Sequence, residues 1–376
     1  MAIIGPVEPF RGGIAKHTTQ LARSLNAMPN IDLRVVSFSQ LYPSWLYPGE
    51  SDLDNSSQRP GDLTIDYMLH ALNPISWRRV AHDLNNWGVE EIIIPAWTFF
   101  VAPCLGMIAR QCKKNGAHVS MVVHNSSDHE DAKWKTAFNA YQLSGADSFL
   151  THNVALAEAL KISYPTAQVC RRAHPIYDQY PEPQNSLTSR AGLELLFFGF
   201  VRPYKGVDIA VNALAQSGVK DVRLTIAGEC WQRRHEIDDL VSDLGLADKV
   251  EILNRYVSDQ EAAELFARAD VVVLPYRSVS GTGIIPLAYH YEKPVIVTDL
   301  PGLREFVTDG VTGWVVPPEA PAELAKLING PLTRKAAQEM APAIKAQKKK
   351  MSWENYSVGL MSLWEDKSGN HPVEAV

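Results

Sequence analysis

The chain has 376 residues, of which 46% are hydrophobic and 21% charged, so at about 150 residues per domain we expect two globular domains and exclude disordered and fibrous classes. The 36 basic and 42 acidic residues give a formal charge of -6, which excludes a uniformly cationic nucleic-acid-binding surface. The four cysteines form no Cys-x-x-Cys pair and predict a protein of the reduced cytoplasm: Cys104, Cys112, Cys170 and Cys230.

The first half of the chain alternates short apolar runs with helical patterns. Ile3 to Gly5 predicts a buried strand rather than a secretory leader, Gly13 to Leu25 predicts an amphipathic helix, and Leu33 to Phe38 predicts a second strand. Further strands are predicted over Glu91 to Ile94, Val119 to Val123 and Ser148 to Thr151. Because strands that alternate with helices form parallel sheets covered on both faces, this half is predicted to be a doubly wound α/β domain.

One apolar stretch, from Ile92 to Ala109, is close to the length of a membrane span. Pro95 and Pro103 interrupt it, and Thr98 is polar. A strand followed by a loop and a helix explains this pattern better than a span does.

The pattern becomes polar and rich in proline between Arg172 and Arg190, which indicates a linker between domains. Strand patterns then return at six places: Leu195 to Phe198, Leu224 to Ala227, Val250 to Leu253, Val271 to Leu274, Val295 to Thr298 and Gly313 to Val316. We therefore predict two Rossmann-like domains, residues 1–180 and 181–350, and a C-terminal segment, residues 351–376, with an amphipathic stretch from Trp353 to Trp364.

Chemistry is expected where these strands end, because open parallel sheets bind ligands at the carboxyl ends of their strands. Gly12 and Gly13 precede the first helix, where backbone amides can approach a phosphate or a sugar hydroxyl. Arg202 and Lys205 lie three residues apart on a loop that Pro203 and Gly206 hold in shape. Two cations in that arrangement predict a clamp for a diphosphate, against the plainer interpretation of two solvated surface charges.

Two further loops also follow the carboxyl ends of predicted strands. Ser280 to Ile284 follows a strand and enters a helix, which predicts a second anion cradle built from amides and hydroxyls. His124 ends a strand of the first half, where an imidazole can donate to a sugar hydroxyl or move a proton near neutral pH. The spacing of His124, His129 and Glu130 matches no standard zinc site. Asp52-Leu53-Asp54 lies in a polar loop, so we predict that the protein binds no metal.

Taken together, these residues resemble the retaining glycosyltransferases of family 4, which have the GT-B fold and act in bacterial polysaccharide and glycoconjugate assembly. The resemblance rests on Gly12-Gly13, His124, Arg202 to Gly206, and Ser278 to Gly310. Lys293-Pro294-Val295-Ile296-Val297-Thr298-Asp299, then Glu305 and Asp309-Gly310-Val311-Thr312-Gly313, resemble the end of the family's donor domain. It implies two Rossmann-like domains facing each other across a cleft. It also implies a final helix that crosses back to the first domain.

The resemblance further implies a role for each cluster. A nucleotide-diphosphate sugar, with UDP or GDP as the nucleotide, would bind mainly to the C-terminal domain, and the acceptor would bind to the N-terminal domain. His124, Arg202 and Lys205 would be the catalytic residues. The donor-binding residues would be Gly12, Gly13, Arg202, Lys205, Arg255, Tyr256, Gly281, Thr282, Gly283 and Ile284. The acceptor-binding residues would be His17, Trp97 and Asn125.

The sequence departs from the family pattern at two places. The family's Glu-x7-Glu pair is missing, because Ser278 to Ser280 and Leu287 occupy its regions. Phe200 stands where the family has an arginine five residues before the lysine. These departures keep a non-catalytic nucleotide-sugar-binding module as an alternative hypothesis.

The acceptor side has less specific patterns. The aromatic segment Tyr42 to Pro48 and the loop with Trp97, Phe99 and Phe100 suit sugar stacking or a lipid-linked acceptor, with core packing as the alternative. Trp77-Arg78-Arg79 resembles a basic amphipathic patch for an anionic membrane surface.

Our sequence-based hypothesis is a cytoplasmic, metal-independent, retaining hexosyltransferase without a cofactor. Its substrates would be a nucleotide sugar and a saccharide or lipid-linked acceptor, and it would have peripheral contact with the inner face of the plasma membrane and no nucleic-acid partner. A nucleotide-sugar epimerase of the same architecture is the catalytic alternative, and it would need a cluster of acids for proton transfer. A dinucleotide-dependent oxidoreductase would need the Gly-x-Gly-x-x-Gly fingerprint, which is missing.

Overall fold

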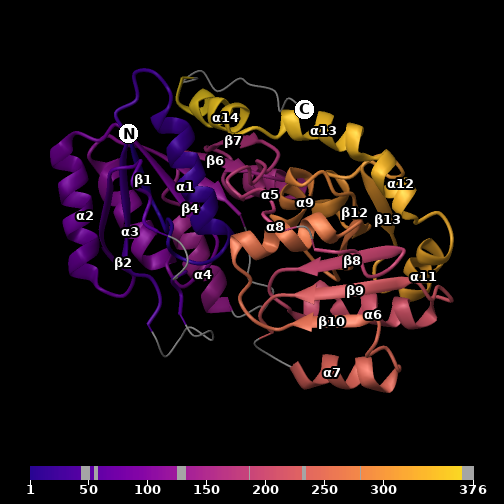
Figure 1. Ribbon diagram of the computed structural model, residues 1–376. Coiled ribbons are helices and arrows are strands. Elements are labelled where there is room, and N and C mark those ends of the chain that lie inside the picture. The colour runs from indigo at the N-terminus through magenta and orange to yellow at the C-terminus, as the bar shows by residue number, and fades with distance from the viewer. Residues whose placement is uncertain are drawn as a thin grey trace. The chain divides into compact units, whose positions relative to one another are not determined.

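The computed structural model describes residues 1–43, 51–54, 58–124, 133–185, 187–230, 234–279 and 281–365 (Figure 1). The chain divides into two compact units. The first comprises residues 1–174 together with the chain from residue 353 onward, and the second comprises residues 175–352.

The first unit is built on a seven-stranded parallel sheet in the order β3-β2-β1-β4-β5-β6-β7. Its strands are β1 (Ala2–Ile4), β2 (Arg34–Gln40), β3 (Ile65–His70), β4 (Glu91–Ala96), β5 (His118–Val123), β6 (Ser148–Thr151) and β7 (Gln168–Arg171). Its helices are α1 (Gly13–Asn26), α2 (Pro74–Trp87), α3 (Ala102–Lys114), α4 (Lys133–Leu143), α5 (Val154–Ser163) and α14 (Trp353–Glu365). The predicted doubly wound α/β domain is confirmed.

Side chains alternate between the two faces of this sheet, as the strand period requires. Ile3 pairs with Val35 and with Ile93, and these three side chains share a core with α1 and α14. Ile92 and Ile94 point to the other face, where the core also contains residues of α2, α3 and α5. Both faces are therefore covered, which explains why the central strands are uniformly apolar.

Two strands of this sheet were not predicted from the sequence. β3 and β7 are its two edge strands, and most of their side chains are only partly buried. An edge strand needs no continuous apolar run, so its sequence gives a weak periodic signal.

The apolar stretch Ile92 to Ala109 forms β4, a short loop and the start of α3, as expected. Among the described residues, no helix combines the length and the apolar character that a bilayer span requires.

Helix α14 packs against α1 (Figure 1). The indole N–H of Trp364 donates a hydrogen bond of 2.6 Å to Ser120 Oγ in the sheet, and Ser357 Oγ lies 2.8 Å from Ser24 Oγ on α1. Leu360 is fully buried in the core that α14 shares with β1 and β4. These contacts place the last described residues in the first unit.

We expect Leu360→Ala to lower the free energy of unfolding by about 2–5 kcal/mol, because it removes buried apolar volume and leaves a cavity. Val358→Ala on the same helix is the control, since the Val358 side chain is 55% exposed. Urea denaturation measures both effects. Equal small losses in the two variants would contradict the packing of α14 described above.

The second unit has a six-stranded parallel sheet in the order β10-β9-β8-β11-β12-β13. Its strands are β8 (Leu193–Phe198), β9 (Val222–Ala227), β10 (Val250–Leu253), β11 (Val271–Leu274), β12 (Val295–Thr298) and β13 (Gly313–Val316). Its helices are η1 (Pro203–Lys205), α6 (Val207–Gln216), α7 (Arg234–Asp243), α8 (Asp259–Arg268), α9 (Ile284–His290), α10 (Pro301–Arg304), α11 (Pro321–Asn329), α12 (Arg334–Glu339) and α13 (Ala341–Lys350). Every strand predicted for this half is present, and its order is that of a Rossmann-like sheet.

The units change at 174/175 and 352/353, whereas the sequence suggested 180/181 and 350/351. Hydrogen bonds explain why residues 175–180 belong to the second unit. The N–H of Ile176 donates to Met351 O, and the Tyr180 carbonyl lies 3.2 Å from His290 Nε2.

Candidate functional site

The residues expected to hold an anion in the second unit lie on the loops after β8 and β11. These strands are neighbours in the sheet, so their carboxyl ends lie at one edge. Gly206 joins the two loops: its φ is +66°, and a Cβ there would lie 2.0 Å from Pro275 O. Only glycine permits this approach, so the sequence at 206 fixes the position of the cation-bearing loop.

Arg277 holds the same loop from the other side. Its backbone N–H donates to Tyr204 O at 2.7 Å, and its guanidinium donates to Pro203 O at 2.8 Å and forms an ion pair with Asp208 on α6. These three contacts end on the loop backbone or on the helix that follows the loop, and Arg277 also forms an ion pair with Glu319. Arg202 and Lys205 are therefore carried by a loop with defined geometry.

Lys205 is a cation without an acidic partner in the part of the chain that the structure describes. Its side chain is partly buried, and its Nζ lies 5.7 Å from the centre of the Tyr276 ring. Burial, and secondarily the charge of Arg202, lower the pKa of Lys205 to about 8. Lysine at this position remains mostly protonated at pH 7, and a bound anion would supply the missing countercharge.

The structure brings Ile284, from the predicted second anion cradle, close to Lys205. A Cβ built on Gly199 would lie 3.3 Å from Lys205 Nζ and 3.4 Å from Ile284 Cδ1, so both side chains converge at the end of β8. Thr282 Oγ1 accepts a 3.1 Å hydrogen bond from the N–H of Ile284. The Ile284 amide, one of the donors expected for the ligand, is thus already partnered by Thr282.

Arg255 and Tyr256 follow β10, which is separated from β8 by β9. The Arg255 guanidinium is exposed and forms an ion pair with Glu261 on α8. The structure therefore holds Arg255 against a protein carboxylate two strands away from Lys205.

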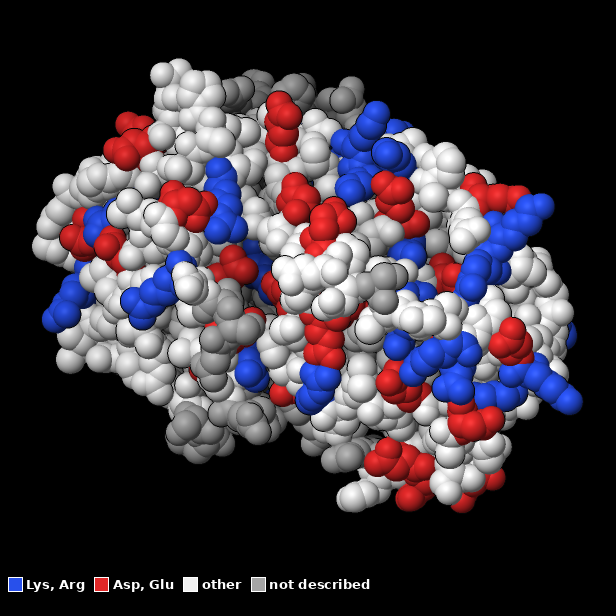
Figure 2. Space-filling view, viewed as in Figure 1, with Lys and Arg blue, Asp and Glu red and all other residues white. Residues whose placement is uncertain are grey.

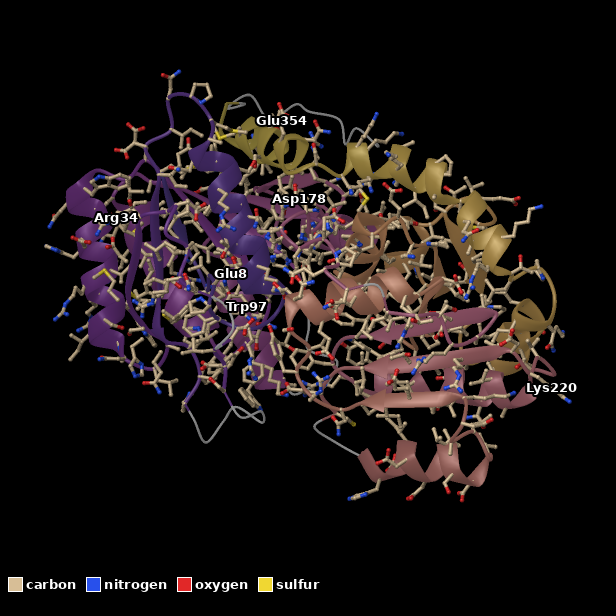
Figure 3. The ribbon with its side chains drawn as sticks, viewed as in Figure 1. Glu8, Arg34, Trp97, Asp178, Lys220 and Glu354 are labelled. Carbon is tan, nitrogen blue, oxygen red and sulfur yellow. The ribbon has the colours of Figure 1, made fainter. Side chains whose placement is uncertain are left out.

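The first unit has its own group of predicted residues at the carboxyl ends of β1 and β4. Gly12 has φ +104° and precedes α1 without a side-chain cap. Glu8 and Trp97 follow these two neighbouring strands (Figure 3). Trp97 is partly buried and packs against the hydrophobic core, which is the packing alternative considered for the aromatic loop. Asn125, His129, Glu130, Ser280 and residues 44–48 of the aromatic segment lie outside the described residues.

Four histidines meet in the first unit: His17 on α1, His124 after β5, His152 after β6, and His174. The His17 ring centre lies 4.7 Å from that of His124, 5.6 Å from that of His152 and 5.2 Å from that of His174. Trp353 and Tyr356 of α14 also contact the His17 ring. Only 1% of His17 and 8% of His124 are exposed. We call these four residues the histidine cluster.

Burial favours the neutral form of three members of the histidine cluster, His17, His124 and His152. Burial, and secondarily His174, lower the pKa of His124 to about 3, and burial together with the neighbouring imidazoles holds the pKa values of His17 and His152 well below the ordinary value. A proton-transfer role for His124 near neutral pH is therefore disfavoured, and the neutral ring acts as a hydrogen-bonding group. Its Nδ1 lies 3.3 Å from His152 Nε2.

His152 and His174 were not identified from the sequence. Each follows a short strand without glycine or acidic neighbours, so neither matched a local motif. The pairing of the parallel strands β5 and β6 places His124 and His152 together. Val123 of β5 pairs with Thr151 of β6, and the two histidines are the next residues after this pair.

Charge on the surface is grouped by helix (Figure 2). Lysines gather on α13, at Lys345, Lys348, Lys349 and Lys350, and acids gather on α7, at Glu236, Asp238, Asp239 and Asp243. The net charge of -6 is thus a balance of local patches.

Comparison with known proteins gives related enzymes. Residues 192–333 match the family model described as glycosyl transferases group 1. The chain is 27% identical over 236 residues to alpha-D-kanosaminyltransferase of Streptomyces kanamyceticus, covering 59% of this chain and 60% of the relative. It is 24% identical over 241 residues to GDP-mannose:glycolipid 4-beta-D-mannosyltransferase of Xanthomonas campestris pv. campestris. This alignment covers 64% of this chain and 66% of the relative. The aligned part spans less than two thirds of each relative's length.

Solved structures show the same fold. Sucrose-phosphate synthase from Thermosynechococcus elongatus matches with a TM-score of 0.72 at 16% identity over 97% of this chain and 98% of that chain. HepE from Anabaena, solved in complex with UDP and glucose, matches with a TM-score of 0.72 at 16% identity. The match covers 97% of this chain and 99% of HepE. The predicted GT-B class, with two Rossmann-like domains, is confirmed.

Proposed function

We propose that the chain is a retaining hexosyltransferase that moves a hexose from a nucleotide-diphosphate sugar to a saccharide or glycolipid acceptor without a metal ion. The observation that carries the proposal is Lys205, a partly buried cation without an acidic partner among the described residues, on a loop shared with Arg202. The match of residues 192–333 to glycosyl transferases supports it. So do the names of the relatives, one of which uses GDP-mannose and a glycolipid.

The reaction breaks the bond between sugar C1 and the β-phosphate oxygen and forms a bond from C1 to an acceptor hydroxyl oxygen. In a front-face displacement the acceptor proton passes to the departing diphosphate oxygen, and the anomeric configuration is kept. Arg202 and Lys205 stabilise the charge that develops on the diphosphate, and a lost donor of this type costs about 3–4 kcal/mol of barrier. These two cations supply the positive charge that a metal ion provides in other phosphate sites.

The stereochemical outcome needs its own measurement, because the names of the relatives include both an alpha and a beta transfer. Proton NMR of the product made from an α-linked donor separates the outcomes. An α-linked product supports retention, and a β-linked product overturns it.

The first experiment is a thermal-shift panel of UDP, GDP, ADP and TDP with their common sugars, in EDTA and in magnesium. We expect one nucleotide family to raise the melting temperature equally in both conditions. Stabilisation by none, or only with magnesium, would contradict the proposal. Acceptor screening with the nucleotide sugar that binds then tests transfer.

A non-catalytic nucleotide-sugar-binding module is a second candidate, because Leu287 occupies a region where the resembled family has a donor-binding glutamate and is 2% exposed. Binding without transfer or hydrolysis across the acceptor screen would favour it. On the acceptor side, the exposed Arg78 and Arg79 of α2 support peripheral contact with anionic lipid, which vesicle sedimentation tests.

We expect His124→Ala to reduce transfer at least tenfold with little change in nucleotide affinity, because the neutral imidazole would bond to the sugar and not to the diphosphate. Steady-state kinetics and calorimetry with the free nucleotide measure the two effects. The exposed His82 on α2 is the control, as His82→Ala. Equal losses of transfer and nucleotide affinity would show that His124 is merely structural.

A further inference from the structure

We propose that His17, His124 and His152 form a binding site for a divalent transition-metal ion of the zinc type. The three side chains come from α1, from the end of β5 and from the end of β6, so the fold brings them together across more than a hundred residues of sequence. All three are buried in the first unit.

The geometry suits one ion. One ring nitrogen from each histidine lies within 4.8 Å of the others. His124 Nδ1 and His152 Nε2 are 3.3 Å apart. Two nitrogens that bind one zinc ion tetrahedrally at about 2.0–2.1 Å are separated by about 3.3–3.4 Å, so this pair already has the required spacing.

The ring nitrogens are also available to a metal. Both nitrogens of His17 are buried and lack a hydrogen-bond partner within the described ranges. His124 Nδ1 and His152 Nε2 contact each other, and an ion between them would replace that contact. Buried imidazole nitrogens are normally partnered, and a metal ion would supply the missing partner. Neutral imidazole is a ligand for zinc, cobalt, nickel and copper rather than for magnesium or calcium.

The surroundings define the rest of the site. Trp353 packs on the His17 ring, and Tyr356 packs on the rings of His17 and His152. The three ligands are uncharged, so a dication keeps its full charge, and its fourth position favours an anion such as hydroxide. The His174 ring centre lies 4.9 Å from that of His152, which places a further imidazole beside the three ligands.

Occupation of this site has a consequence that rests on the proposed function. His124 would hold the metal ion through one ring nitrogen and the transferred sugar through the other, so the dication would stand beside the sugar and oppose the positive charge that develops on it during transfer. Micromolar zinc is then expected to inhibit transfer, and EDTA to restore it. Absence of transfer by the metal-free protein would contradict the proposed function. It would not bear on the metal site, because metal binding is measured separately.

The test is titration of the metal-free full-length protein with Co²⁺, followed by visible absorption, together with the zinc content of protein purified from zinc-supplemented medium. We expect one equivalent of metal and the visible absorption of Co²⁺ in a tetrahedral site with nitrogen ligands. Absence of this band and of stoichiometric zinc in the wild type would overturn the proposal.

Variants assign the ligands. His17→Phe and His152→Phe keep a ring in the core but remove a ligand, and each is expected to weaken Co²⁺ binding at least a hundredfold. His82→Asn, at an exposed histidine of α2, is expected to bind as the wild type does. Circular dichroism of each metal-free variant verifies that it is folded, and His152→Gln replaces any variant that is not. A wild-type band in folded His17→Phe or in a folded variant at His152 would overturn the site.

Discussion

Replacement of Lys205 by methionine is expected to lower transfer at least tenfold and to raise stability at pH 7. The first effect follows from the loss of a cation that would neutralise the departing diphosphate. The control is Lys220→Met, at an exposed lysine of the same unit (Figure 3). Steady-state kinetics and nucleotide calorimetry on both variants measure the effect. Unchanged transfer and affinity in Lys205→Met would remove Lys205 from the site.

The stability effect follows from proton linkage. The pKa of Lys205 is about 8 in the folded chain, against the ordinary lysine value of 10.5 in the unfolded chain, so the unfolded chain binds the extra proton between these values. Stability therefore rises as pH increases from 8 to 10.5, and the penalty of the buried charge is fully present below pH 8. Methionine carries no charge, so the variant is expected to gain up to about 3 kcal/mol at pH 7.

This gain should disappear near pH 10.5, which urea denaturation at several pH values measures. Nucleotide affinity of the wild type should fall as the pH rises through about 8, because Lys205 then loses its charge in the free protein. In Lys205→Met the affinity should be low and independent of pH in this range. If Lys205→Met were less stable than the wild type at pH 7, the packing of the lysine stem would contribute more to stability than the burial of its charge costs.

Gly206→Ala is expected to lower the free energy of unfolding by about 3 kcal/mol or more. A Cβ at this position would lie 2.0 Å from Pro275 O and 3.0 Å from Ile209 Cδ1, and the residue has φ +66°. The backbone must therefore move as well as adopt a strained conformation. Movement of this loop displaces Lys205, so nucleotide affinity should fall too.

The matched control is Gly218→Ala, since no atom lies within 4 Å of the position of a Cβ at Gly218. Thermal denaturation and calorimetry with the nucleotide are measured on both variants. If Gly206→Ala were as stable as Gly218→Ala, the loops after β8 and β11 would not be held together as described.

The sequence predicted the central strands well, because strands covered on both faces must be apolar over their whole length. β11 is an uninterrupted run of valine and leucine, and it was predicted with the observed bounds. The edge strands β3 and β7 were missed, since most of their side chains are only partly buried and form no continuous apolar run. The Arg202 to Gly206 loop could be predicted because proline, glycine and two cations stand within five residues.

The sequence singled out His17 and His124 separately, but it could not predict that four histidines meet, because the members of the histidine cluster are distant in sequence. Only the parallel pairing of β5 with β6 and the packing of α1 and α14 place them in contact. Their depressed pKa values likewise come from burial, which no local pattern specifies. The sequence by itself determined the two parallel sheets and the cation-bearing loop, through strand periodicity and turn chemistry. Tertiary structure alone decided which buried side chains meet, because such contacts depend on how strands and helices pack.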